Sequence, residues 1–254
     1  MKKLIGGPTN WKAIIGLLFL IAIVSCDVSP LSHGEIDNLS GIGATISIEQ
    51  NPCNEKINNI SMKLFDKKGK QIGNENITVR VNNTELFLYI VHELYYTKKI
   101  RYVADNIPVS DSYYFEVELS DSTILPLAYV KAIQPIKRES VKLAERGAID
   151  LETKIEWEEM KEFDNVLIWK SYKMNDSKIH RGGPYGESSI HKSIEQNGGY
   201  VVPISFYRDS VSTITALNFE FHANKEGLIN PELLSGSNVT LHSMLVKRIK
   251  FDTK

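Results

Sequence analysis

Side chains that do acid–base, metal or covalent chemistry are spread thinly along this chain. Its six histidines, at positions 33, 92, 180, 191, 222 and 242, show no His-Glu-x-x-His pair or other metal-ligand spacing. Glu158, Glu159, Glu162 and Asp164 form a short acidic run. Such a group can hydrolyse glycosides when burial raises one pKa, but a charge run between strands is typical of a solvated turn. We therefore predict no enzyme, no metal site and no cofactor.

One loop has the composition of a contact site. Residues 180–187 read His-Arg-Gly-Gly-Pro-Tyr-Gly-Glu, which combines flexible glycines with a cation, an aromatic ring and an anion. Arginine and tyrosine are enriched at interaction hot spots, and binding residues tend to lie on loops of a rigid scaffold. We therefore predict that Arg181 and Tyr185 contact a partner. The alternative is a plain connector between two strands.

Trp169 supports a glycan as the ligand, because sugar-binding surfaces use exposed aromatic rings. Trp11 lies in the N-terminal leader, whereas Trp157 and Trp169 lie in expected strands. Trp169 is out of phase with Val166 and Ile168, which alternate as one face of a strand. Its ring is therefore expected on the opposite, exposed face.

The N-terminal segment carries a targeting signal. A lysine-rich start and an uncharged run over residues 13–24 lead into the tetrapeptide Ile23-Val24-Ser25-Cys26. This order resembles the signal of bacterial lipoproteins, whose lipobox places an aliphatic residue three before the cysteine and a small residue just before it. The resemblance implies that residues 1–25 are removed and that Cys26 carries the lipid that anchors the protein to a membrane. The alternatives are an ordinary signal cut near Ser25 and a retained helix, although a spanning helix needs about 20 apolar residues.

The residues after Cys26 indicate a tether and a single remaining thiol. Residues 26–43 are polar without apolar periodicity, as expected of a spacer between a lipid and a folded domain. Cys53 is the only other cysteine. If Cys26 carries lipid, no disulfide forms within the chain, and Cys53 is expected to be a half-buried thiol in a turn.

Composition and charge favour a folded protein that does not bind nucleic acid. The chain is 42% hydrophobic and 24% charged, which is ordinary for a globular protein. Removing residues 1–25 takes away three lysines and no acid, so the formal charge falls from −1 to −4. Nucleic-acid binding needs a basic stripe. The nearest candidate, from Lys131 to Arg146, is interrupted by Glu139 and Glu145 and is interpreted as a solvated connector.

From Ala44 onward, short alternating runs bounded by turn residues predict an all-β fold of two tandem immunoglobulin-like β-sandwiches. Strands are expected at residues 45–48, 60–65, 77–81, 86–92, 99–103, 113–119 and 124–132, and then at 150–157, 166–173, 200–206, 213–222 and 239–251. The pattern stops near Gln134-Pro135. This places the first sandwich at residues 44–135 and the second at 136–254.

The alternation also predicts which side chains form the core. In the first sandwich the expected inward set is Met62, Leu64, Val79, Val81, Phe87, Tyr89, Phe115, Val117 and Leu119. In the second, Trp157 and the alternating strand that begins at Val166 resemble the early strands of fibronectin type III domains. The resemblance implies a buried tryptophan packed between two sheets.

Together these features predict a lipid-anchored protein of the bacterial outer membrane or cell surface that binds another protein or serves as an accessory subunit. The pattern resembles surface lipoproteins of Bacteroidetes built from tandem immunoglobulin-like domains. It also resembles fimbrillin-type pilus subunits, which assemble by donating a strand to a neighbour. A glycan-binding module is the further alternative and predicts an exposed groove containing Trp169 or Tyr185.

Overall fold

The computed structural model describes residues 38–53, 58–92, 98–174, 189–208 and 212–252, and most of them are in strands, which confirms the all-β prediction. The N-terminal half contains η1 (Leu39–Gly41), β1 (Gly43–Gln50), β2 (Asn58–Phe65), β3 (Gln71–Ile72), β4 (Thr78–Val81), β5 (Thr84–His92), β6 (Lys98–Ile107), β7 (Ser112–Glu118) and β8 (Ile124–Lys131). The C-terminal half contains η3 (Arg138–Ser140), β9 (Val141–Leu143), β10 (Arg146–Gly147), β11 (Thr153–Trp157), β12 (Asn165–Met174), β13 (Ser189–Ser193), β14 (Gly198–Val202), α2 (Ile204–Tyr207), β15 (Ser212–Glu226), β16 (Leu228–Ile229) and β17 (Asn238–Phe251).

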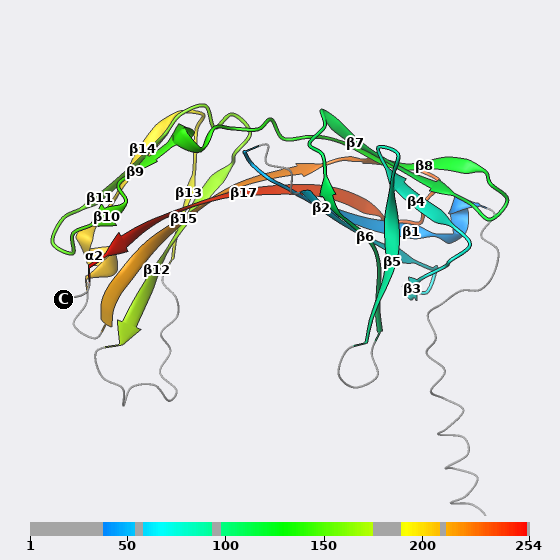
Figure 1. Ribbon diagram of the computed structural model, residues 1–254, viewed down its shortest axis with the longest axis horizontal. Coiled ribbons are helices and arrows are strands. Elements are labelled where there is room, and N and C mark those ends of the chain that lie inside the picture. Colours follow the sequence, from blue (N-terminus) through cyan, green and yellow to red (C-terminus); the bar gives the residue numbers. More distant parts are fainter. Residues whose placement is uncertain (1–37, 54–57, 93–97, 175–188, 209–211, 253–254) are drawn as a thin grey trace, which may run out of the picture.

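One sheet path runs through both halves of the chain. Its order is β13-β12-β15-β17-β1-β2-β6-β5-β4-β7-β8-β16, and a separate small sheet has the order β14-β11-β9. Strand β17 pairs parallel to β1 on one side and antiparallel to β15 on the other. The strands form an arch, with the small sheet above one end and β7 and β8 above the other (Figure 1). The division into two domains at residue 135 stays a prediction.

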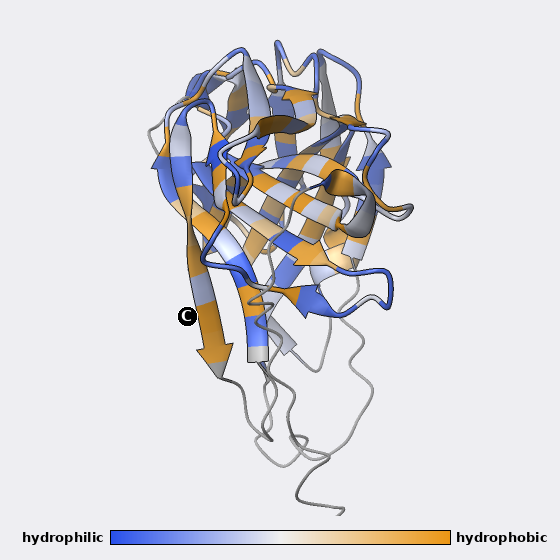
Figure 2. Ribbon diagram, turned by 90° about the vertical axis from the view of Figure 1, so that its right-hand side faces the viewer, coloured by the Kyte–Doolittle hydropathy of each residue, from blue (hydrophilic) through white to orange (hydrophobic). Residues whose placement is uncertain are grey.

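The core lies on the convex side of the arch, between the long strands and the layers that cover them. Ile46, Ile48 and Met62 are fully buried there. At the other end, the ring of Trp157 on β11 meets Phe221 on β15 edge-on, with ring centroids 5.6 Å apart. The expected buried tryptophan between two sheets is therefore Trp157. Hydrophobic and hydrophilic residues alternate along the strands (Figure 2), as a sheet with one covered face requires.

The predicted inward set is correct except at β5. Phe87 and Tyr89 point outward, with exposed fractions of 68% and 57%, whereas Leu86 is buried and Leu88 is packed against the core. Both faces of β5 carry large apolar side chains, so alternation identifies two faces without showing which one is covered. The prediction selected the wrong face.

The segment after residue 135 holds more structure than the expected connector. It contains η3 and the short strands β9 and β10, and it pairs with β11 and β17. Two or three residues are too few to show a period, which is why the sequence pattern missed them. Strand β13 was also missed, and Pro203 starts the helical turn α2 where a strand was expected to continue to residue 206. The basic side chains from Lys131 to Arg146 are exposed, as predicted.

Two tight turns are set by local side chains. The expected loop after β2 is present: the Asp66 carboxylate accepts hydrogen bonds from the N–H groups of Lys68 and Lys70, at 2.8 and 2.9 Å, and Gly69 has a φ of 74°. Between β4 and β5, Asn82 and Asn83 have φ values of 45° and 66°. Positive φ at both residues is typical of a two-residue hairpin turn that matches the twist of the strands.

Buried polar contacts hold the chain between β8 and η3 against both halves. At the end of β1, the Gln50 side chain donates to the Ile133 carbonyl at 2.5 Å and accepts from the Ile133 N–H at 3.0 Å. From β15, the Lys225 ammonium donates to the Ala132 carbonyl at 2.8 Å and to the Glu162 carboxylate at 2.6 Å. The connector is thus a fixed part of the sheet assembly. Over the described residues, no helix has the length and apolarity to cross a membrane.

Candidate functional site: the concave face of the sheet

The concave side of the arch is a single sheet surface that no second layer covers within the described part of the chain (Figure 1). We call it the concave face. It is formed by the outward residues of β12, β15, β17, β1, β2, β6 and β5. Sheet register places Phe87 beside Val103, Val103 beside Ser61, and Ser61 beside Ser47. Residues from four strands therefore form one continuous row across the face.

One end of the concave face is aromatic. Phe87 and Tyr89 are two residues apart on β5, so their rings lie on the same side, and more than half of each is exposed. Tyr89 lies directly opposite Arg101 on β6. The Nε atom of Arg101 is buried without a hydrogen-bond partner, and no described carboxylate forms an ion pair with this side chain.

The other end combines an indole with exposed aliphatic side chains. Trp169 on β12 is half-buried, and its Nε1–H donates to Oε1 of Glu220 at 2.8 Å. Glu220 lies opposite Val246 on β17, and Val246 and Met244 are exposed by 48% and 40%. Trp169 does lie on the face opposite Val166 and Ile168, as its phase predicted.

A histidine pair lies between the two ends. Nδ1 of His222 is 3.1 Å from Nε2 of His242, and Nε2 of His222 is 3.6 Å from Oε2 of Glu220. Burial lowers the pKa of His242, and the neighbouring His222 lowers it further, while Glu49 acts in the opposite direction. Across the ranges that the structure describes, no cluster of three or more His, Cys, Asp or Glu side chains is arranged to hold a metal ion.

The residues predicted from the sequence are only partly placed by the structure. Trp169 belongs to the concave face. Arg181 and Tyr185 lie outside the described residues, as does Cys26. Cys53 is half-buried in a turn, as expected, and its backbone N–H donates a hydrogen bond to Oδ1 of Asn51.

The histidine pair and the Tyr89–Arg101 neighbours were missed because they arise from sheet register. The two histidines are 20 positions apart in sequence, and they meet only because β15 and β17 pair antiparallel. The sequence signal that could have found this surface is the apolar character of both faces of β5. If only one face of the strand is covered, the other must be an exposed apolar surface.

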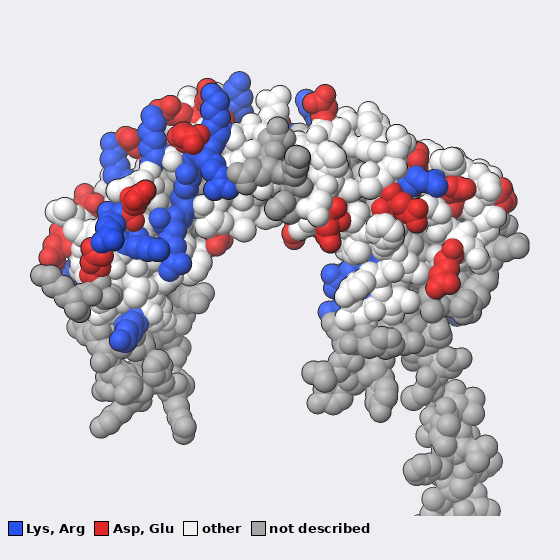
Figure 3. Space-filling model, in the orientation of Figure 1, with Lys and Arg blue, Asp and Glu red and all other residues white. Residues whose placement is uncertain are grey.

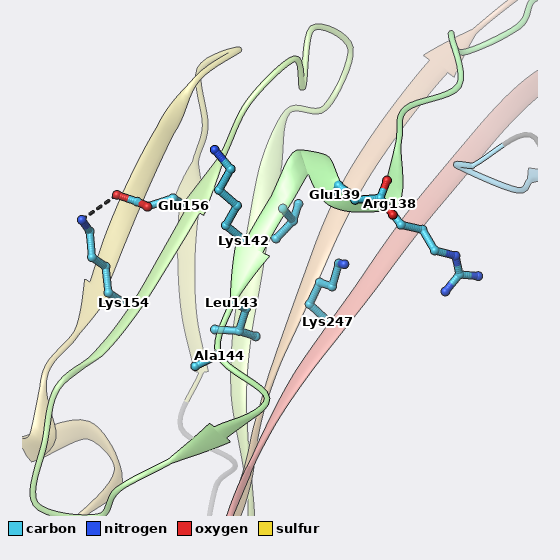
Figure 4. Close-up of a pocket in the computed structure, with 9 residues that line it drawn as sticks. Arg138, Glu139, Lys142, Leu143, Ala144, Lys154, Glu156 and Lys247 are labelled. Carbon is cyan, nitrogen blue, oxygen red and sulfur yellow. Dashed lines mark ion pairs between the residues drawn. The ribbon is translucent and has the colours of Figure 1, made fainter.

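A second surface is a shallow basic groove at the edge of the small sheet, with a volume of about 640 Å³. Lys and Arg side chains gather at this end of the molecule, mixed with acids (Figure 3). The cations that line the groove are Arg138, Lys142, Lys154 and Lys247 (Figure 4). Two of them already bind acids, because Lys142 pairs with Glu158 and Lys154 with Glu156, both at 2.5 Å. The groove is therefore largely neutralised by its own neighbours.

An arched sheet with an open concave face defines an all-β protein with an uncovered sheet surface. No family model matches the sequence, and no curated protein matches it. Among solved structures, the chain matches SGBP-B of the Bacteroides ovatus mixed-linkage glucan utilization locus, solved in complex with a mixed-linkage heptasaccharide. The identity is 11% and the TM-score 0.19, and the match covers 84% of this chain and 60% of that one. A likeness at this TM-score supports no inference about function.

Proposed function

We propose that this is a lipid-anchored, non-enzymatic binding protein of the bacterial envelope that holds a glycan chain on its concave face. The observation that carries the proposal is the pair of exposed rings, Phe87 and Tyr89, on an uncovered sheet surface. Large exposed apolar surfaces on a folded protein mark interaction sites. An aromatic ring presents a broad apolar face, which suits the C–H faces of a sugar.

The rest of the concave face supplies hydrogen-bonding groups for a long polar ligand. Ser61 and Ser47 continue the row that starts at Phe87, and Thr240 extends it onto β17. Hydroxyl groups both donate and accept hydrogen bonds, as sugar hydroxyls do. An extended chain could therefore stack on the aromatic end and bond to the polar centre, without a deep pocket.

Binding is tested by affinity electrophoresis of the purified protein in gels that contain a panel of neutral and acidic polysaccharides. We expect Tyr89→Ala and Phe87→Ala each to weaken binding about tenfold, because a stacked aromatic ring contributes on the order of 1 kcal/mol or more. The matched control is Tyr114→Ala on β7, since Tyr114 is 59% exposed but belongs to the layer on the convex side. Equal losses in Tyr89→Ala and Tyr114→Ala, or no binding to any polysaccharide, would reject the concave face as a glycan site.

The lipid anchor is supported by the order of residues around Cys26 and is tested separately. Cells grown with an alkyne-bearing fatty acid should label the wild type and Cys53→Ser, whereas Cys26→Ser should lose the label and leave the membrane fraction. Two acyl chains hold a protein on a bilayer far more firmly than one. A Cys26→Ser variant that still labels and sediments with membranes would exclude lipidation at this residue.

The aliphatic end of the concave face favours a second candidate, a protein partner. Met244 and Val246 are exposed side chains without a ring for a sugar to stack on. Crosslinking in intact cells followed by purification should recover a stoichiometric partner that Met244→Glu loses. Leu228→Glu is the control, because Leu228 is 72% exposed on β16. Equal recovery from both variants would argue against a partner at this end.

A further inference from the structure

The aromatic end of the concave face carries two cations, Arg101 and Lys63, that form no ion pair with any acid of the described residues. Arg101 on β6 lies opposite Tyr89, and Met62 on β2 pairs with Tyr102. Lys63 and Arg101 are each one residue further along these strands, so alternation places both on the concave face close to this pair. Beyond them, β2 pairs with β3 instead of β6. Neither cation forms an ion pair within the described ranges of the chain.

Arg101 is also incompletely hydrogen-bonded by its own protein. Its Nε atom is buried with no partner, although buried polar groups are nearly always paired. The side chain as a whole is half-buried, so a ligand on the concave face would meet the guanidinium at its terminal nitrogens. A guanidinium binds a carboxylate through two parallel N–H bonds, and the lysine alongside adds a point charge. The ligand best matched to this pair is therefore a planar carboxylate, held next to the rings of Tyr89 and Phe87.

We propose that the glycan bound on the concave face is acidic, with a uronic acid residue at the aromatic end. Its sugar ring stacks on Tyr89 or Phe87, and its carboxylate binds Arg101 and Lys63. This inference rests on the proposed function and specifies its ligand class. The basic groove is a poorer anion site, because Lys142 and Lys154 are already paired with Glu158 and Glu156.

The test compares polygalacturonate with its carboxyl-reduced form, a neutral polymer of the same linkage, in binding assays on the full-length protein. We expect the wild type to prefer the acidic polymer by about tenfold or more, since a charge-assisted hydrogen bond is worth at least that factor. The preference should shrink as salt is raised, because salt screens exposed charges. This comparison requires no variant.

Variants then locate the charge recognition. Arg101→Gln and Lys63→Gln should lower affinity for polygalacturonate by a larger factor than affinity for the reduced polymer, so that the acidic preference shrinks. Arg101→Lys should retain part of the affinity for polygalacturonate, because it keeps the positive charge but not the two parallel N–H donors of the guanidinium. The control is Lys247→Gln, which removes a cation of the basic groove and should change neither affinity. Thermal unfolding of each variant shows whether it is folded. If Arg101→Gln does not fold, Lys63→Gln alone tests the charge recognition.

The outcomes separate this inference from the proposed function. If both polymers bind equally and Tyr89→Ala weakens both, the acidic preference is wrong while glycan binding stands. A loss caused by Lys247→Gln instead of Arg101→Gln would move the anion to the basic groove and overturn the assignment. Failure of the wild type to bind any polysaccharide overturns both proposals together.

Discussion

The hydrogen bond between His222 and His242 on the concave face depends on the protonation of the two rings. A neutral pair shares one hydrogen bond across the 3.1 Å between Nδ1 and Nε2, whereas two charged rings have no acceptor and repel. Glu220 lies beside His222 and also accepts from the indole of Trp169. Glu220 therefore connects the histidine pair to the ring of Trp169.

Acid should destabilise the protein through this pair. The folded-state pKa of His242 lies below its ordinary value of 6.5, mainly because of burial. A lowered pKa contributes stability that is present above about pH 6.5 and is lost as the pH falls through the folded-state value. We expect the melting temperature to fall less between about pH 7.5 and about pH 5.5 in His242→Gln than in the wild type. The control is His191→Gln, which removes an exposed histidine on β13 and should show the same fall in melting temperature as the wild type. If His242→Gln also shows the wild-type fall, His242 is not the source of the acid sensitivity.

At the scale of the element, the Gln50 side chain hydrogen-bonds to the backbone of Ile133 as a neighbouring strand would. Its amide makes both a donor and an acceptor bond to the backbone of Ile133, and the side chain is 3% exposed. Replacing it by an apolar side chain of similar size would leave two buried backbone groups unpaired. Each unpaired group costs about 1–3 kcal/mol.

Gln50→Met should therefore lower the free energy of unfolding by about 2–4 kcal/mol, measured by urea denaturation. The matched control is Gln196→Met at an exposed position, which should change stability by less than about 0.5 kcal/mol. Similar values for the two variants would show that the Gln50 bonds are replaced by water.

The long elements could be predicted from the sequence and the short ones could not. Strands β2, β6 and β17 show enough alternation to fix their positions within a few residues, whereas β10 and β16 have two residues each and no period. Strand β5 was predicted at the right position but with its buried and exposed faces exchanged, because Leu86 and Phe87 are both strongly apolar. As a result, the exposed rings that carry the proposed site were assigned to the core. Trp169, whose neighbours are clearly unequal, lies on the face that its phase predicted.

At the scale of the molecule, the sheet joins the two predicted domains through β1 and β17. Six residue pairs link these parallel strands, from Thr45 with Asn238 to Gln50 with Ser243, and the inward residues Val239 and Leu241 are buried. Pairing between residues so distant in sequence has no signature in local alternation. The sequence therefore predicted strands but not which strands are neighbours.

Fragments should reveal this coupling. The full chain is expected to unfold in one transition, and residues 44–135 or 136–254 expressed alone are expected to lack cooperative unfolding, because each loses one partner of the β1–β17 pair. Circular dichroism during thermal denaturation measures both properties. A fragment of residues 44–135 that unfolds cooperatively by itself would instead support two independent sandwiches.

The parallel pairing of β17 with β1 also sets an order of events during biogenesis. A chain that is synthesised or exported from its N-terminus presents β1 long before β17, at residues 238–251, has emerged. Until then, one side of β1 exposes unpaired backbone groups, which form a template for pairing with other chains. That side of β1 is paired only when β17 arrives, so this part of the sheet is completed by the last strand of the chain.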